Sequence, residues 1–124
     1  MRYITIIKSA ERAAVPPKSL IDAIRKLGEE AGKAGVIVDM GGLKPTATGA
    51  RVRLAGGKIR VLDGPFSEAK EVIGGYAVYE LESKAEAIDW SRRFLQLHVE
   101  HWPEWEGEVE IREMYGPGDS PRAS

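Results

Sequence analysis

Residues 3–7 spell YITII, a run of β-branched and aromatic side chains that is typical of a β-strand. Residues 76–81 spell YAVYEL and have the same character. Because almost every side chain in these two runs is apolar, both faces of each strand need to be covered. The two runs therefore predict a sheet that is buried on both sides, and the rest of the chain has to supply the cover.

Two amphipathic helices are predicted beside these strands. Glycine adopts the left-handed conformation at low cost, so Gly35 is the predicted end of the first helix. Ser83 is the predicted start of the second, since its hydroxyl can accept a hydrogen bond from the backbone of Glu86, whose carboxylate reaches back. Apolar residues at helical spacing form the two stripes: Leu20, Ile24, Leu27, Ala31 and Ala34 in the first helix, and Ala87, Ile88, Ser91, Phe94, Leu95 and His98 in the second.

The remaining strands complete an α+β pattern. Residues 51–54 and 58–61 alternate charged and apolar side chains around two glycines, which predicts a hairpin with one buried face. With shorter strands at residues 36–38 and 108–112, the expected order is β-α-β-β-β-α-β. This order indicates a ferredoxin-like fold, an antiparallel sheet with two helices on one face. We expect the core to combine helix residues with sheet residues: Leu20, Ile24, Leu27, Ile88, Phe94 and Leu95 against Val52, Leu54, Ile59 or Val61, together with Ala77 or Tyr79.

Two helices can cover only one face of such a sheet. The apolar side chains on its second face would form a large exposed patch, which usually marks an interface. A sheet-to-sheet homodimer is therefore expected. The predicted domain spans residues 1–115, and residues 116–124 are predicted to be a loose polar tail.

The composition limits the possible functions. The 124 residues fit one domain, and 43% hydrophobic with 30% charged residues is an ordinary globular balance. A formal net charge of −1 with no basic stripe argues against nucleic acid as a partner. No apolar run is long enough for a membrane helix and no signal-peptide pattern is present, so a cytoplasmic location is expected. The chain has no cysteine and no glycine-rich nucleotide motif, and we expect no cofactor.

Residues 62–71, LDGPFSEAKE, and residues 73–76, IGGY, resemble the signature of the YCII-related, DGPF-type proteins. A looser similarity extends from Met1 to about Met114. The resemblance implies a ferredoxin-like fold of the dimeric α/β-barrel type, but no reaction. Some similar proteins are neighbours or accessories of extracytoplasmic-function sigma factors, and related YCII proteins have been suggested to be enzymes with a His–Asp pair in a cleft. This chain departs from that pattern, because no histidine precedes Asp63 to pair with Asp39.

The segment around Asp63 has two interpretations. Asp, Gly and Pro are ordinary turn residues, with Phe66 as the side chain that holds the loop in the core. Alternatively, Asp63 faces a cleft at a strand end, with Lys70 and Glu71 on the following turn and with Phe66 and Tyr76 as further ligand contacts. A carboxylate–ammonium–carboxylate group of this kind could move protons or orient a polar ligand.

His98 and His101 lie three residues apart, on one face of a continuing helix. A metal site is the weakest interpretation, because no third ligand stands at diagnostic spacing. They could also be histidines that the helix dipole favours at its end, or His98 could line the cleft as an acid/base group. The aromatic residues around them could stack on a ligand, or stabilise the core or the dimer interface: Tyr76, Tyr79, Trp90, Trp102 and Trp105.

Two functions follow from these residues. The first is a cofactor-independent enzyme that uses Asp63 and His98 for acid/base chemistry on a small polar metabolite. The alternative is a non-catalytic protein that binds a small molecule or assists a sigma factor. A purely structural role is a third option, and the fold alone does not choose among them.

Overall fold

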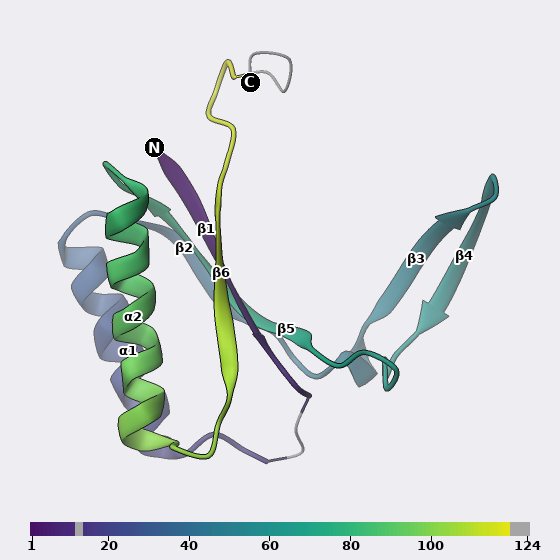
Figure 1. Cartoon of the computed structure of the whole chain (residues 1–124), viewed down its shortest axis with the longest axis horizontal. Helices are drawn as coiled ribbons and strands as arrows, with labels where there is room; N and C mark the ends of the chain where they lie inside the picture. The colour runs from purple at the N-terminus through teal and green to yellow at the C-terminus, as the bar shows by residue number, and fades with distance from the viewer. Residues whose placement is uncertain (12–13, 120–124) are drawn as a thin grey trace.

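The computed structural model describes residues 1–11 and 14–119. Figure 1 shows the chain, whose elements follow in this order: β1 (Arg2–Ser9), α1 (Lys18–Lys33), β2 (Ile37–Gly42), a 3₁₀ turn η1 (Thr46–Thr48), β3 (Ala50–Ala55), β4 (Lys58–Asp63), β5 (Val72–Glu80), α2 (Lys84–His101) and β6 (Gly107–Glu113).

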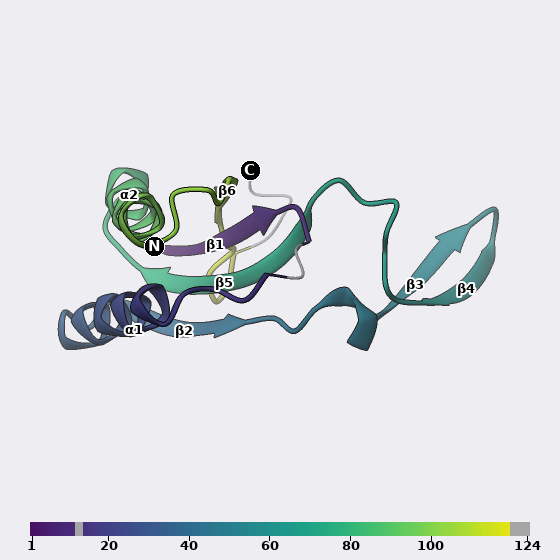
Figure 2. The same ribbon diagram turned by 90° about the horizontal axis from the view of Figure 1, so that it is seen from below.

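Four strands form one antiparallel sheet in the order β2-β5-β1-β6. Both helices lie on the same side of this sheet, α2 toward β6 and α1 toward β2 (Figures 1 and 2). The predicted α+β, ferredoxin-like fold is therefore confirmed. The strongly apolar strands β1 and β5 take the two central positions, which agrees with their need for cover on both faces.

Local signals set the helix ends as predicted. The Ser83 hydroxyl accepts a hydrogen bond of 3.3 Å from the backbone N–H of Glu86 at the start of α2. Gly35 follows the end of α1 with a φ of 72°, a conformation in which other residues are strained. No helix in residues 1–11 and 14–119 is long and apolar enough to cross a membrane.

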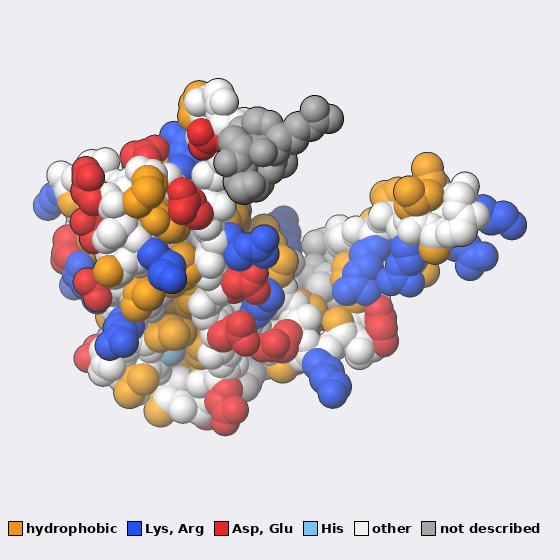
Figure 3. Space-filling model, turned by 45° about the horizontal axis from the view of Figure 1, so that its top comes forward, with side chains coloured by type: hydrophobic (Ala, Val, Ile, Leu, Met, Phe, Trp, Pro, Cys, Tyr) orange, Lys and Arg blue, Asp and Glu red, His pale blue; other side chains and the backbone are white. Residues whose placement is uncertain are grey.

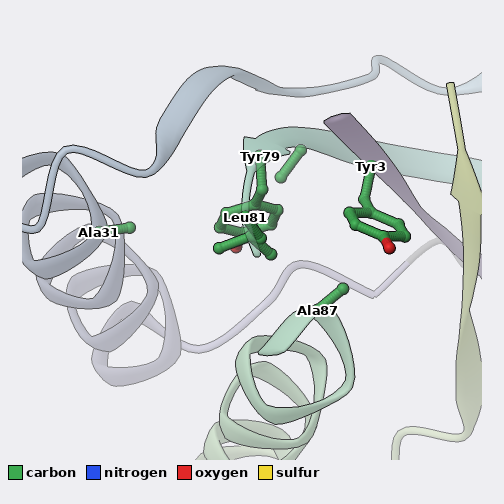
Figure 4. Packing of buried hydrophobic residues seen from close by; sticks show 6 residues of the cluster. Tyr3, Ala31, Tyr79, Leu81 and Ala87 are labelled. Carbon is green, nitrogen blue, oxygen red and sulfur yellow. The ribbon is translucent and has the colours of Figure 1, made fainter. Parts of the chain in front are cut away.

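The buried core is small and lies where the helices meet the sheet (Figure 4). Tyr79 stacks on Trp90 with ring centroids 5.9 Å apart, and Leu20 is only 1% exposed. Small residues, Ala31 and Ala87, stand where the helices approach this cluster, which lets them come close to the sheet. The buried cluster consists of Tyr3, Ala31, Ala77, Tyr79, Leu81 and Ala87.

The prediction that the hairpin contributes to this core is wrong. Strands β3 and β4 lie between β2 and β5 in the chain, one strand more than the predicted order, and form a separate two-stranded sheet. This hairpin projects away from the body of the molecule (Figures 1 and 2). The alternating pattern indicates that one face of the hairpin is apolar, but it does not indicate which part of the structure covers that face. All four side chains predicted to be buried are about 70% exposed: Val52, Leu54, Ile59 and Val61.

The second face of the four-stranded sheet carries apolar side chains, as expected from the strand sequences. Ile4 and Ile6 on β1 stand beside Tyr76 and Val78 on β5, and all four are half-buried. No described helix lies over them. At the other end of the chain, Gly116 and Asp119 close a turn, and the rest of the predicted tail, residues 120–124, lies outside the described residues.

Truncation of Leu20 tests the core. Leu20→Ala removes a side chain that is 1% exposed, so it should lower the free energy of unfolding by about 2–5 kcal/mol. Ile21→Ala is the matched control on the same helix, because Ile21 is 45% exposed and its loss should cost less than about 1 kcal/mol. Urea denaturation measures the free energy of unfolding of each variant. Equal losses for the two substitutions would show that α1 does not pack on the sheet through the face that carries Leu20.

Candidate functional site

A cleft of about 540 Å³ opens between the two helices and the sheet. Helix α1 contributes Leu20, Ile24 and Leu27 to one wall, and α2 contributes Phe94 and His98 to the other. The floor is the helix-facing side of β1 and β5, and Trp102, Trp105 and Val109 also line the cleft. A volume of this size with mostly apolar walls and few polar groups is typical of sites for small molecules.

His98 lines the cleft and is buried, at 7% exposure. Its ring lies between two aromatic rings, with centroids 4.8 Å from Phe94 and 4.3 Å from Trp105. Its Nδ1 lies 3.0 Å from the backbone carbonyl oxygen of Phe94. A carbonyl oxygen can only accept a hydrogen bond, so Nδ1 carries a proton, and in the neutral ring Nε2 then keeps its lone pair. The fold therefore holds the imidazole as an oriented base.

Burial lowers the pKa of His98 below its ordinary value, because the charged form loses its hydration. The hydrogen bond to the Phe94 carbonyl acts in the opposite direction and offsets part of this effect. The net shift favours the neutral imidazole near pH 7, which is the form that accepts a proton.

A second, more open hollow of about 660 Å³ adjoins the same histidine. His98 and Trp105 line both spaces, and Lys70 and Glu71 line the second one. The structure thus brings together three of the residues proposed from sequence: His98, Lys70 and Glu71. Glu106 and Glu108 add further carboxylates there, so this hollow is charged where the cleft is apolar.

Asp63 and Phe66 stand elsewhere. Asp63 is exposed at the end of β4, opposite Ala50, and neither it nor Phe66 lines the cleft or the second hollow. The Phe66 backbone N–H donates to the Thr46 hydroxyl at 3.1 Å, and the Arg51 guanidinium lies 3.9 Å from the Phe66 ring centroid. A Cβ on Gly64 would come within 1.7 Å of the Thr46 carbonyl oxygen, so only glycine fits there. The DGPF segment forms the base of the projecting hairpin.

Tyr76 borders the cleft at one end of β5, but its side chain lies on the opposite face of the sheet, beside Ile6, where it is paired with Asp39. Its hydroxyl donates to Asp39 Oδ2 at 2.8 Å, and this hydrogen bond to a carboxylate raises the pKa of Tyr76. From the sequence, only a histidine was considered as a hydrogen-bond partner for Asp39, so the pair with Tyr76 was missed. The two residues are 37 positions apart, and only the pairing of β2 with β5 brings them together.

His101 is half-buried at the last position of α2. Within residues 1–11 and 14–119, no three His, Asp or Glu side chains converge closely enough to hold a metal ion. Sequence reasoning assigned Ile24, Leu27 and Phe94 to the core, whereas they are half-buried in the cleft walls. An amphipathic stripe has the same pattern in both situations, so the sequence carried no signal for the difference.

Comparisons with known proteins agree with the family signature of the sequence. A sequence model of the YCII-related domain matches residues 1–96. The chain belongs to the YCII-related family. It is also 32% identical over 103 residues to an uncharacterized protein, R00369, of Rhizobium meliloti (strain 1021), a match that covers 82% of this chain and 77% of that protein. Neither match names an activity.

The lowered pKa of His98 has a consequence for stability. The unfolded chain binds a proton at this residue more readily than the folded protein does, so stability should fall as the pH drops below the ordinary value of 6.5. His98→Gln should therefore lose less stability than the wild type between about pH 7.5 and about pH 5. Melting temperatures across this range measure the difference.

His101→Gln is the matched control, since it removes the chain's other histidine three residues away on the same helix. It should keep the pH dependence of the wild type. If His98→Gln kept that dependence as well, the burial of His98 would not be linked to its protonation.

Proposed function

We propose that this YCII-related protein binds a small molecule in the cleft between its helices and its sheet, and that His98 removes a proton from that molecule. The proposal depends above all on one observation: a buried histidine, fixed by its bond to the Phe94 carbonyl, stands between an apolar cleft and a charged hollow. Histidine with a pKa below its ordinary value is a suitable general base near neutral pH.

The proton would pass from an acidic C–H or O–H of the ligand to Nε2 of His98. The electron pair and the negative charge would stay on the ligand, and His98 would become positively charged. Lys70 lines the charged hollow beside His98, but the carboxylates of Glu71, Glu106 and Glu108 line it too, so the hollow gives the negative charge of the ligand no net stabilisation. An exposed lysine contributes only modestly, so the orientation of His98 is the larger contribution.

The walls also favour one class of ligand. Leucine, isoleucine and phenylalanine side chains offer no hydrogen bonds, so they favour a ligand with an apolar body over the small polar metabolite expected from sequence. A single polar group next to the reactive atom would be directed toward His98 and the charged hollow. The ligand class supported best is a small, mainly apolar weak acid.

An apolar anionic dye tests the binding site without knowledge of the natural ligand. Anilinonaphthalene sulfonate should fluoresce when it binds the folded protein, because the cleft excludes water from the dye. Ile24→Trp fills the cleft from α1, where Ile24 is half-buried, and should weaken the dye's affinity by about tenfold or more.

The control is Lys26→Trp, which adds the same ring at an exposed position of the same helix. It should bind the dye as the wild type does. Equal dye binding by the two variants, with both folded by circular dichroism, would contradict the proposed site. A thermal-shift screen of aromatic and aliphatic carboxylic acids then follows, and any true ligand should stabilise the wild type but not Ile24→Trp.

A further inference from the structure

Trp105 lies in the short segment between α2 and β6, where the chain turns back from the helix to the sheet. Two backbone hydrogen bonds tie this segment to the last turn of the helix. The Trp102 N–H donates to the His98 carbonyl at 2.8 Å, and the Trp105 N–H donates to the Trp102 carbonyl at 2.9 Å. The Trp105 side chain is half-buried and lines both the apolar cleft and the charged hollow, so it stands where the two spaces adjoin.

The indole of Trp105 has a prepared place beside the sheet. Gly107 opens β6 and pairs with Ser9 of β1. A Cβ on Gly107 would overlap the Trp105 ring and would lie 2.5 Å from the Lys8 carbonyl oxygen, so only glycine leaves room for the ring here. The indole is therefore held between the start of β6 and the imidazole of His98, whose ring centroid is 4.3 Å away.

We propose that Trp105 is a positioning residue for His98, and that its indole closes the apolar cleft toward the charged hollow so that water and the carboxylates of the hollow stay away from the imidazole. This role rests on the proposed function of His98 as a base, and it names the side chain that keeps this base neutral. Phe94 contacts the same imidazole, with ring centroids 4.8 Å apart, but it does not line the hollow. The cover on the side of the hollow comes from Trp105.

The charges near His98 indicate what the indole excludes. Among the described residues, α1 contributes no ionisable side chain to the cleft, and the exposed Glu11 and Lys44 offset each other. In the hollow, one lysine faces three carboxylates, so the net charge there is negative. The ionisable side chains that line the two spaces besides His98 are Glu11, Lys44, Tyr76 and Tyr79 in the cleft, and Lys70, Glu71, Glu106 and Glu108 in the hollow.

The rest of the body adds to these negative surroundings. The hairpin of β3 and β4, residues 50–63, carries four basic residues and one acidic residue, and since the whole chain carries −1, the remainder carries a formal charge of −4. Figure 3 shows the basic side chains of this hairpin standing clear of the body. Removal of the indole would therefore expose His98 to water in net negative surroundings, and both changes favour the protonated imidazole.

Trp105→Ala tests the proposal through the titration of His98, which needs no ligand. Histidine ring signals in NMR spectra between about pH 5 and about pH 8 report the pKa of His98. In Trp105→Ala this pKa should rise from its lowered wild-type value toward or above the ordinary 6.5, because the charged form regains hydration. Trp105→Phe keeps an aromatic ring over the imidazole and should restore a pKa close to that of the wild type.

The matched control is Val99→Ala, which removes apolar atoms from the hollow at a side chain that is 63% exposed. It should leave the titration of His98 unchanged. Gly107→Ala then displaces the indole without altering an aromatic residue, because its methyl group takes the place of the ring edge. The pKa of His98 should rise in this variant as it does in Trp105→Ala. Each variant is compared only after it shows a cooperative melt and a wild-type circular dichroism spectrum.

Two results would overturn the proposal. The first is a folded Trp105→Ala protein in which the pKa of His98 is unchanged or lower. The second is an equal rise in Trp105→Phe or Val99→Ala, which would show that the indole gives no particular cover. The dye experiment is separate: if the dye failed to bind, the proposed ligand site would be contradicted, whereas the titration would still decide whether Trp105 covers His98.

Discussion

Strand β1 determines most of this structure, because it is paired on both edges, with β5 on one side and β6 on the other. Its residues alternate between two environments. Tyr3 and Thr5 are buried toward the helices, with the Thr5 hydroxyl satisfied by the Ala77 carbonyl at 3.1 Å, whereas Ile4 and Ile6 face the opposite side. A shift of one residue in the pairing would exchange the two sets. The register of β1 therefore decides which of its side chains face the helices and the candidate ligand site and which lie on the opposite face of the sheet.

The two ends of the helix layer are packed differently, and this difference creates the site. Ala31 near the end of α1 and Ala87 near the start of α2 belong to the tight cluster around Tyr79 and Leu81 (Figure 4). From the middle of the helices toward their opposite ends, larger side chains such as Ile24, Phe94 and His98 line a cleft instead of filling it. The small core gives the protein its fold, and the unfilled end provides space for a ligand.

Sequence reasoning succeeded where the signal is local. The caps at Ser83 and Gly35, the stripe of α1 and the existence of the hairpin all depend on residues a few positions apart. It failed where a pattern does not show what an apolar face packs against: the apolar face of the hairpin of β3 and β4 was assigned to the core. The same limit applies to the site. His98, Lys70 and Glu71 do line one hollow, but Asp63 does not join them, and the bond from Tyr76 to Asp39 depends on strand pairing that no local pattern contains.

The proposed function requires the fold to hold His98 as a neutral base with its proton on Nδ1. A long-range ¹H–¹⁵N correlation spectrum of the native protein at neutral pH measures this state directly, because the two ring nitrogens of a neutral histidine differ in chemical shift according to which one is protonated. We expect a neutral His98 ring with the proton on Nδ1, which donates to the Phe94 carbonyl, and an unprotonated Nε2. A ring protonated on Nε2 alone, or on both nitrogens at neutral pH, would contradict it.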